Sequence, residues 1–229
     1  MEHDRTHPVP LEPFLHRAKP PARGGRGQIQ GRQPAAAHRP QPRWKLTKEQ
    51  YHAVPIIKDG AKIIFESGDD TQDIARYLDA KLELNLFPER YEGQQYLLCR
   101  HFEHEVEAVG FKLNDIYFRE FVPKAEQVYF VRHKERKFGR GCIDQWQANQ
   151  KTLLRQLEQT LLPAEQMLAH SDFLLTHCPL FADFNLFGMV ENFLYSGHYR
   201  LPKSLPHLRR WHEGMKTVKI DPFLIDLPF

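Results

Sequence analysis

The sequence predicts an α+β fold that is mostly α, in which a β-hairpin and one helix precede an all-helical bundle. Two short apolar runs flank Asp59-Gly60, and Asp-Gly between β-branched runs is a strong hairpin signal. From about Tyr91 onward, apolar residues recur at the three-to-four spacing of helices. With 229 residues and 41% apolar content, the chain can form one compact globule or two small domains.

Residues 1–44 differ in composition from the rest of the chain. They hold eight of the 17 prolines, and their eight Lys and Arg against three acidic residues give a net charge of +5. Because the whole chain carries +3, residues 45–229 carry −2. Proline and glycine disfavour a packed core, so we expect a disordered leader over 1–44. The near-neutral remainder argues against a nucleic-acid-binding face, and we expect no nucleic-acid partner.

Several other classes of protein are disfavoured by the sequence. Charges interrupt every long apolar stretch, and the first residues lack the pattern of a signal peptide, so we expect no membrane partner. The three cysteines, Cys99, Cys142 and Cys178, are odd in number and widely spaced, which fits neither a disulfide framework nor a zinc site. We therefore expect no metal and a reducing, cytoplasmic location.

The first ordered elements are expected over 53–82. Strands at 53–57 and 62–65 would flank a turn at 58–61. Asp69, Asp70 and Thr71 supply N-cap residues and early negative charge for the helix that follows.

Five helices are expected in the bundle, over 91–122, 125–137, 143–168, 180–195 and 205–218. The segment 180–195 is apolar nearly all round, which predicts a place at the centre of the bundle. The basic run 132–137 could bind an anion, but a solvated helix face is the preferred interpretation.

The order of these motifs resembles that of the cytosolic glutathione transferases. A strand begins at Val54-Pro55, an Asp-Gly hairpin and an acid–hydroxyl pair follow, and Ile74-x-x-Tyr77-Leu78 leads into the helical half. The resemblance covers roughly residues 45–220.

This resemblance implies a thioredoxin-like, glutathione-binding first domain, incomplete here at 45–88, and a helical C-terminal domain over 91–220. It also implies glutathione as co-substrate, a small electrophilic substrate and a possible homodimer. The basic run, continued through Phe138-Gly139, resembles the bacterial glutathione-dependent β-etherases.

The same resemblance implies a set of glutathione-binding residues. Val54, followed by a cis Pro55, would pair with the glutathione backbone as an added strand. An acid–hydroxyl pair at a helix N-terminus would hold the γ-glutamyl group. Counting forward from the hairpin gives Glu66-Ser67 for this pair, and counting back from the helix gives Asp70-Thr71. We prefer Asp70-Thr71, because the binding requires a helix N-terminus.

Residues 179–184 resemble the family's buried capping segment. In that segment a hydroxyl residue and an aspartate three positions later cap the central helix. Leu180 stands at the hydroxyl position here. Only the aspartate half, Asp183, is therefore expected to act as a structural cap.

The catalytic residue is unknown, because the family places its sulfur-activating group after a first strand that residues 1–44 do not offer. Read one base later, the possible codons of residues 11–17 permit Trp-Ser-Pro-Phe-Cys-Ile, which looks like a family active-site turn. The same shift over residues 22–32 permits Leu-Glu-Ala-Ala-Gly-Ala-Lys-Phe-Lys-Val-Val, a helix end followed by a strand. We hypothesise that the leader is frame-disrupted, with the frame restored close to Trp44.

Two functions follow from this reading. The first is a glutathione transferase that conjugates or reduces an electrophile, provided that its first domain is intact. The alternative is a catalytically inactive, transferase-like binding or structural protein.

Overall fold

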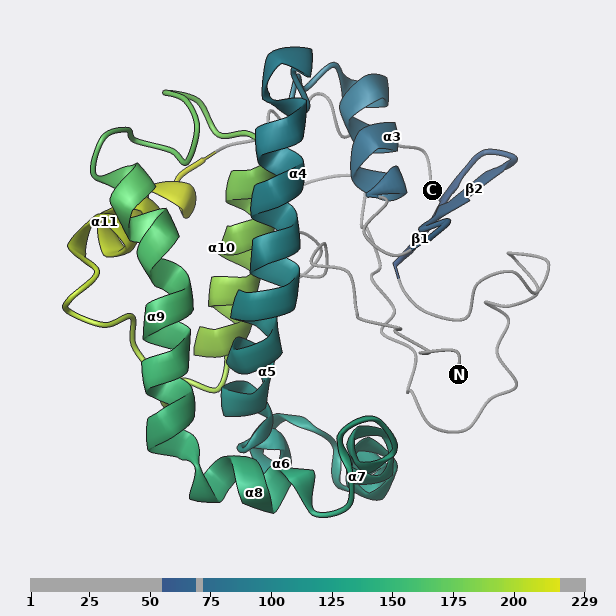
Figure 1. The fold of residues 1–229 in the computed structure, drawn as a ribbon. Coiled ribbons are helices and arrows are strands. Elements are labelled where there is room, and N and C mark those ends of the chain that lie inside the picture. Colours follow the sequence, from purple (N-terminus) through teal and green to yellow (C-terminus); the bar gives the residue numbers. More distant parts are fainter. Residues whose placement is uncertain (1–54, 69–71, 219–229) are drawn as a thin grey trace, which may run out of the picture. The chain divides into compact units, whose positions relative to one another are not determined.

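The computed structural model describes residues 55–68 and 72–218 (Figure 1). The chain divides into two compact units: Met1–Phe87 with Lys219–Phe229, and Pro88–Val218. The expectations for the leader, for Val54 and for Asp70-Thr71 lie outside the described residues.

The predicted hairpin is present in the first unit. Strands β1 (Ile56–Asp59) and β2 (Lys62–Phe65) pair antiparallel, with Asp59 opposite Lys62. The expected turn at 58–61 is too long, because only Gly60 and Ala61 connect the strands. Gly60 has a φ of 57°, a left-handed conformation that glycine adopts without steric cost and that a two-residue hairpin requires.

One helix, α3 (Asp73–Leu82), follows the hairpin, close to the predicted cap residues. Ile74 and Ala75 form its buried side. The helix ends at Glu83, which adopts a left-handed φ of 53°.

The second unit is helical, as predicted. Its helices are α4 (Glu92–His101), α5 (Ala108–Asp115), α6 (Phe118–Phe121), α7 (Lys124–Phe138), α8 (Cys142–Ala148), α9 (Gln150–Leu168), α10 (Phe181–Leu194) and α11 (Pro206–Met215). A 3-10 turn (Glu89–Tyr91) leads into α4, and a π-helical segment (Phe102–Glu107) joins α4 to α5. No helix in the described part of the chain is long and apolar enough to cross a bilayer.

Two of the predicted helices are interrupted. The segment 91–122 breaks at Ile116-Tyr117, where the Tyr117 side chain packs against other parts of the chain instead of continuing the helical face. The segment 143–168 breaks at Asn149, whose side-chain amide donates to the Gln145 carbonyl at 2.9 Å. Asparagine commonly competes with helix formation in this way.

Helix α10 lies at the centre of the second unit, as its composition predicts. It packs on α4 and α5 and also contacts α11 (Figure 1). Ten of its residues are buried, among them Asp183 and Asn185. Gly110 of α5 faces Phe193 of α10, since a Cβ at Gly110 would lie 3.6 Å from the Cβ of Phe193, an ordinary van der Waals contact.

Candidate functional site

A carboxylate from the end of the hairpin caps the N-terminus of α3. Glu66 is 6% exposed, and its two oxygens accept hydrogen bonds from the Asp73 amide at 2.8 Å and the Ile74 amide at 3.3 Å. The first amides of a helix have no acceptor within the helix, and a negative charge there is stabilising. Glu66 therefore occupies the helix end that the sequence analysis assigned to glutathione.

The neighbouring hydroxyl also bonds within the first unit. The Ser67 backbone N–H and Oγ both donate to Asp73 Oδ2, at 2.7 and 2.5 Å. Pro55 is buried immediately before β1. Of the six residues predicted to bind glutathione, Pro55, Glu66 and Ser67 therefore lie within the described part of the chain.

A second contact ties α3 to the hairpin turn. The Asp59 carboxylate accepts hydrogen bonds from the Tyr77 hydroxyl and the Lys81 ammonium. These bonds, first that of Lys81 and then that of Tyr77, lower the pKa of Asp59. Sequence reasoning missed this contact, because the partners lie 18 and 22 positions apart. It holds the helix in a fixed orientation on the hairpin.

In the second unit, Asp183 is buried at the start of α10, as predicted. Its Oδ2 accepts from the Leu180 amide at 3.0 Å, which is the aspartate half of the capping motif. Its Oδ1 accepts from the Leu174 amide at 2.9 Å and from the Trp211 indole N–H at 3.0 Å. Leu180 has no side-chain acceptor, so the hydroxyl half of the motif is absent. Asp183 instead joins α10 to the preceding loop and to α11.

A glutamine from a distant helix supports the same helix end. Gln95 of α4 is 2% exposed, and its Oε1 accepts from the Ala182 amide at 3.0 Å. No local pattern indicates this bond, because 87 positions separate the partners. The N-terminus of α10 is thus held by side chains from two parts of the chain.

Burial raises the pKa of Asp183 to about 6, although its hydrogen bonds act in the opposite direction. A carboxyl group whose pKa is higher when folded than when unfolded binds its proton more tightly in the folded state. Its contribution to stability is therefore largest at low pH and falls as the pH rises from the unfolded value of 3.8 to about 6.

Between about pH 4 and about pH 6, we expect the free energy of unfolding of the wild-type chain to fall by up to about 3 kcal/mol more than that of Asp183→Asn. The amide does not titrate, so subtracting its values removes the contribution of all other ionisable groups. Urea unfolding of both proteins across this range measures the difference. A difference that is independent of pH would contradict the raised pKa.

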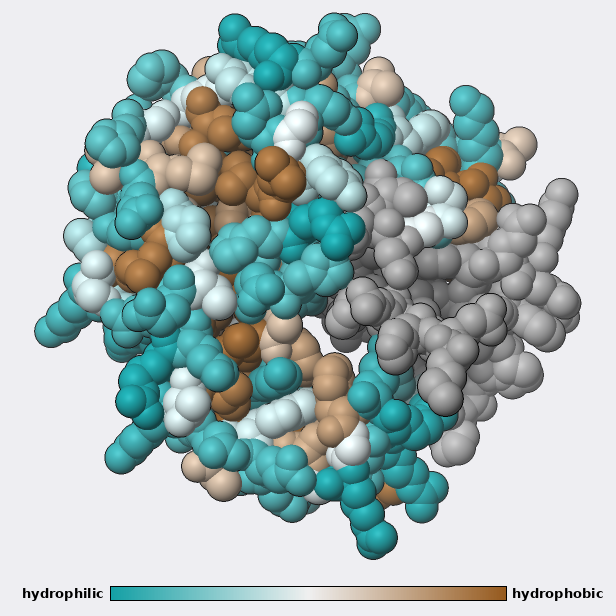
Figure 2. Space-filling model, in the orientation of Figure 1, coloured by the Kyte–Doolittle hydropathy of each residue, from teal (hydrophilic) through white to brown (hydrophobic). Residues whose placement is uncertain are grey.

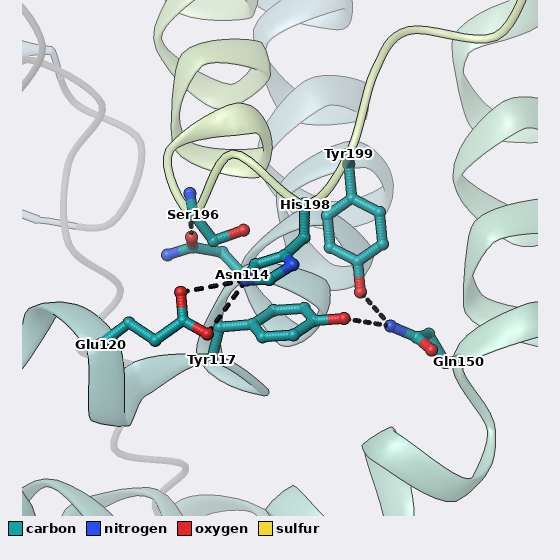
Figure 3. A network of polar contacts seen from close by, with 7 residues as sticks. All are labelled: Asn114, Tyr117, Glu120, Gln150, Ser196, His198 and Tyr199. Atoms are coloured by element: carbon teal, nitrogen blue, oxygen red, sulfur yellow. Dashed lines mark hydrogen bonds and ion pairs between the residues drawn. The ribbon is translucent and has the colours of Figure 1, made fainter.

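A polar network closes the opposite end of α10 (Figure 3). The Gln150 side-chain amide donates to the hydroxyls of Tyr117 at 2.9 Å and Tyr199 at 2.6 Å. The His198 ring stacks on the Tyr117 ring with 3.7 Å between centroids, and its Nε2 lies 2.9 Å from Glu120. The network joins the loop after α10 to α6 and to the start of α9.

This network ties the loop after α10 to the rest of the helical unit. Burial raises the pKa of Tyr199 to about 12, so its phenol stays protonated at neutral pH and cannot serve as a base. Asn114 adds a second tie to the same loop, because its Oδ1 accepts from the Ser196 amide at 3.1 Å.

A small recess lies between α6, α7 and α8. Its volume is about 100 Å³, well below the roughly 300 Å³ of a typical small-molecule site. Arg119, Glu135 and Asp144 are its charged lining residues. Within residues 55–68 and 72–218, no group of three His, Cys, Asp or Glu side chains could hold a metal ion.

Comparison with known protein families gives a match to part of the helical unit. The family described as "Glutathione S-transferase, C-terminal domain" matches residues 139–214, which cover α8 to α11 and include the Asp183 cap. A search of curated proteins finds no match to the chain. Residues 139–214, which lie within the helical unit, are therefore similar to the C-terminal domain of the glutathione S-transferase family.

Proposed function

We propose that the chain derives from a glutathione-dependent transferase whose first, thioredoxin-like domain binds glutathione and whose helical domain lines the electrophile pocket. The family match over residues 139–214 is the observation that carries this proposal. The hairpin and α3 support it, because they precede the helical unit in the order that the resemblance implies. The β-etherase resemblance stays a prediction, as do homodimer formation and a cytoplasmic location.

We assign the glutathione clamp to Val54, Pro55, Asp70 and Thr71, and assign Glu66 and Ser67 to capping. The geometry around α3 supports the capping half of this division, and the assignment of Asp70 and Thr71 rests on the resemblance. The two carboxylate oxygens of Glu66 accept hydrogen bonds from the amides of Asp73 and Ile74, while the Ser67 hydroxyl donates to the Asp73 carboxylate. A γ-glutamyl carboxylate would have to displace Glu66 to reach those two amides.

The sulfur-activating group is missing from residues 1–44 as they stand. Glutathione needs such a group because the thiolate is the nucleophile. We therefore propose that the present chain is catalytically inactive or nearly so, and that the frame-restored chain, in which residues 11–43 are read one base later, is the active transferase. The coding DNA tests this directly: codons that cannot spell Trp-Ser-Pro-Phe-Cys-Ile would end the hypothesis.

Substitutions at the clamp distinguish the two registers. In the frame-restored chain, we expect Asp70→Asn and Thr71→Val each to weaken glutathione binding by about tenfold, since each removes one hydrogen bond to a charged group. Ser67→Ala is the matched control and should leave affinity unchanged. Isothermal titration calorimetry measures all three. If Ser67→Ala alone weakens glutathione binding, the acid–hydroxyl pair that binds glutathione is Glu66-Ser67.

A further inference from the structure

Helix α7 is attached to its unit on one side only. Phe130 stacks on Phe118 at 5.2 Å between centroids, and the Lys134 ammonium lies 2.6 Å from the buried Asp115 carboxylate. Phe138 contacts Trp146 at 5.5 Å. None of the fifteen residues of α7 is fully buried. The side opposite these contacts therefore faces outward along the whole helix.

The outward side has cations at its exposed positions and no exposed carboxylate. Lys124, Arg132, Arg136 and Lys137 are all exposed, and Arg140 continues the series just beyond the helix end. The two acidic residues of α7, Glu126 and Glu135, are both partly buried. Glu135 is also turned to the Gly141 amide, which donates to it at 2.8 Å. Strongly hydrophilic side chains gather at the lower right of the molecule, where Figure 1 places α7 (Figure 2).

An apolar pair lies within this cationic surface. Val128 is 62% exposed and Tyr129 is 47% exposed. Val128 lies four positions after Lys124 and four before Arg132, and Tyr129 lies three before Arg132, so the pair neighbours these cations on the helix surface. A cluster of Lys and Arg on one surface attracts the anionic lipids of a bilayer, and an exposed tyrosine suits the level of the headgroups.

We propose that the outward side of α7, comprising Lys124, Val128, Tyr129, Arg132 and Arg136, docks on an anionic lipid bilayer. The cations would lie among the lipid phosphates, while Val128 and Tyr129 enter the boundary between headgroups and acyl chains. A helix of this length covers about 22 Å of surface. The proposal departs from the expectation of no membrane partner, which was made for the whole chain, because the sequence does not reveal which side of α7 is exposed.

A nucleic acid fits the same side less well. Val128 is 62% exposed and cannot stack on a base as an aromatic ring does, so a nucleic acid would leave this apolar side chain without a matching contact. A bilayer accommodates the valine, the tyrosine and the cations together.

Co-sedimentation of the full chain with vesicles tests the proposal. We expect binding at least about tenfold stronger to phosphatidylcholine vesicles with about one-third phosphatidylserine than to pure phosphatidylcholine. Binding should weaken as salt is raised, because exposed charges are screened. Equal binding to the two kinds of vesicle, or none to either, would overturn the proposal.

Two variants and a control locate the surface. Both K124Q/R132Q/R136Q and V128S/Y129S should lose about tenfold or more in affinity for the anionic vesicles. The control, K151Q/R155Q/R209Q, removes three exposed cations from α9 and α11 and should bind as the parent does. Circular dichroism checks that all four proteins are equally helical. If V128S/Y129S binds as the parent does and single-stranded DNA competes fully, the surface is a nucleic-acid site and the proposal fails.

Discussion

Replacing Asp183 by alanine is expected to lower the free energy of unfolding of the helical unit by about 3 kcal/mol at neutral pH. The carboxylate accepts hydrogen bonds from Leu174, Leu180 and Trp211. Alanine leaves all three donors buried with no acceptor, and each such donor costs about 1–3 kcal/mol. Removal of the charge offsets part of this loss, since a buried carboxylate is itself expensive to desolvate.

Urea unfolding followed by tryptophan fluorescence measures this change, and Trp211 reports on the site itself because its indole N–H donates to Asp183. Asp144→Ala is the matched control. Asp144 is the third residue of α8, as Asp183 is of α10, but Asp144 is exposed. We expect the control to change stability by less than about 0.5 kcal/mol. Equal unfolding midpoints for Asp183→Ala and the parent would refute the capping role.

The Asp183 site shows how far local patterns reach. The resemblance of residues 179–184 to the family's capping segment predicted a buried aspartate cap three positions after Leu180. The partners in α4 and α11 were not predictable, because Gln95 and Trp211 lie 87 and 28 positions from the groups that they contact. Local sequence determines which end of a helix needs a cap, and tertiary packing determines which distant side chains complete it.

The hairpin and α3 show a similar division. Asp59-Gly60 predicted the turn, and the apolar spacing predicted the helix. The use of Glu66 as a cap was not predicted, since the same two residues suit a glutathione clamp equally well by count. Only the distances to Asp73 and Ile74 favour the capping role.

The basic run of α7 was visible in the sequence, but its meaning depends on exposure. Lys134 is partly buried against Asp115, whereas Arg132 and Arg136 face outward. A count of charges treats these three cations alike, so it predicts a solvated helix face. It also misses Val128 and Tyr129, which lie among the exposed cations.

Restoring the shifted frame over residues 11–43 is expected to raise glutathione turnover of a general electrophile by at least about 30-fold at neutral pH. The thiol of glutathione resembles that of free cysteine, with a pKa of about 8.5, so about 3% is thiolate at pH 7. A residue that donates a hydrogen bond to the sulfur, or a helix N-terminus beside it, makes the thiolate the main species. That change in thiolate population alone supplies the predicted factor, before any gain from tighter binding.

The matched control is the frame-restored chain with the Ser and Cys of Trp-Ser-Pro-Phe-Cys-Ile both replaced by alanine. It should bind glutathione as the frame-restored chain does, because the rest of its restored first domain and the proposed clamp residues Val54, Pro55, Asp70 and Thr71 are unchanged, but it should not regain turnover. Calorimetry and a spectrophotometric conjugation assay separate these two results. Turnover by the present chain at the rate of the frame-restored chain would place the catalytic group after residue 44. In that case the helical domain and the hairpin would have to supply the sulfur-activating residue themselves.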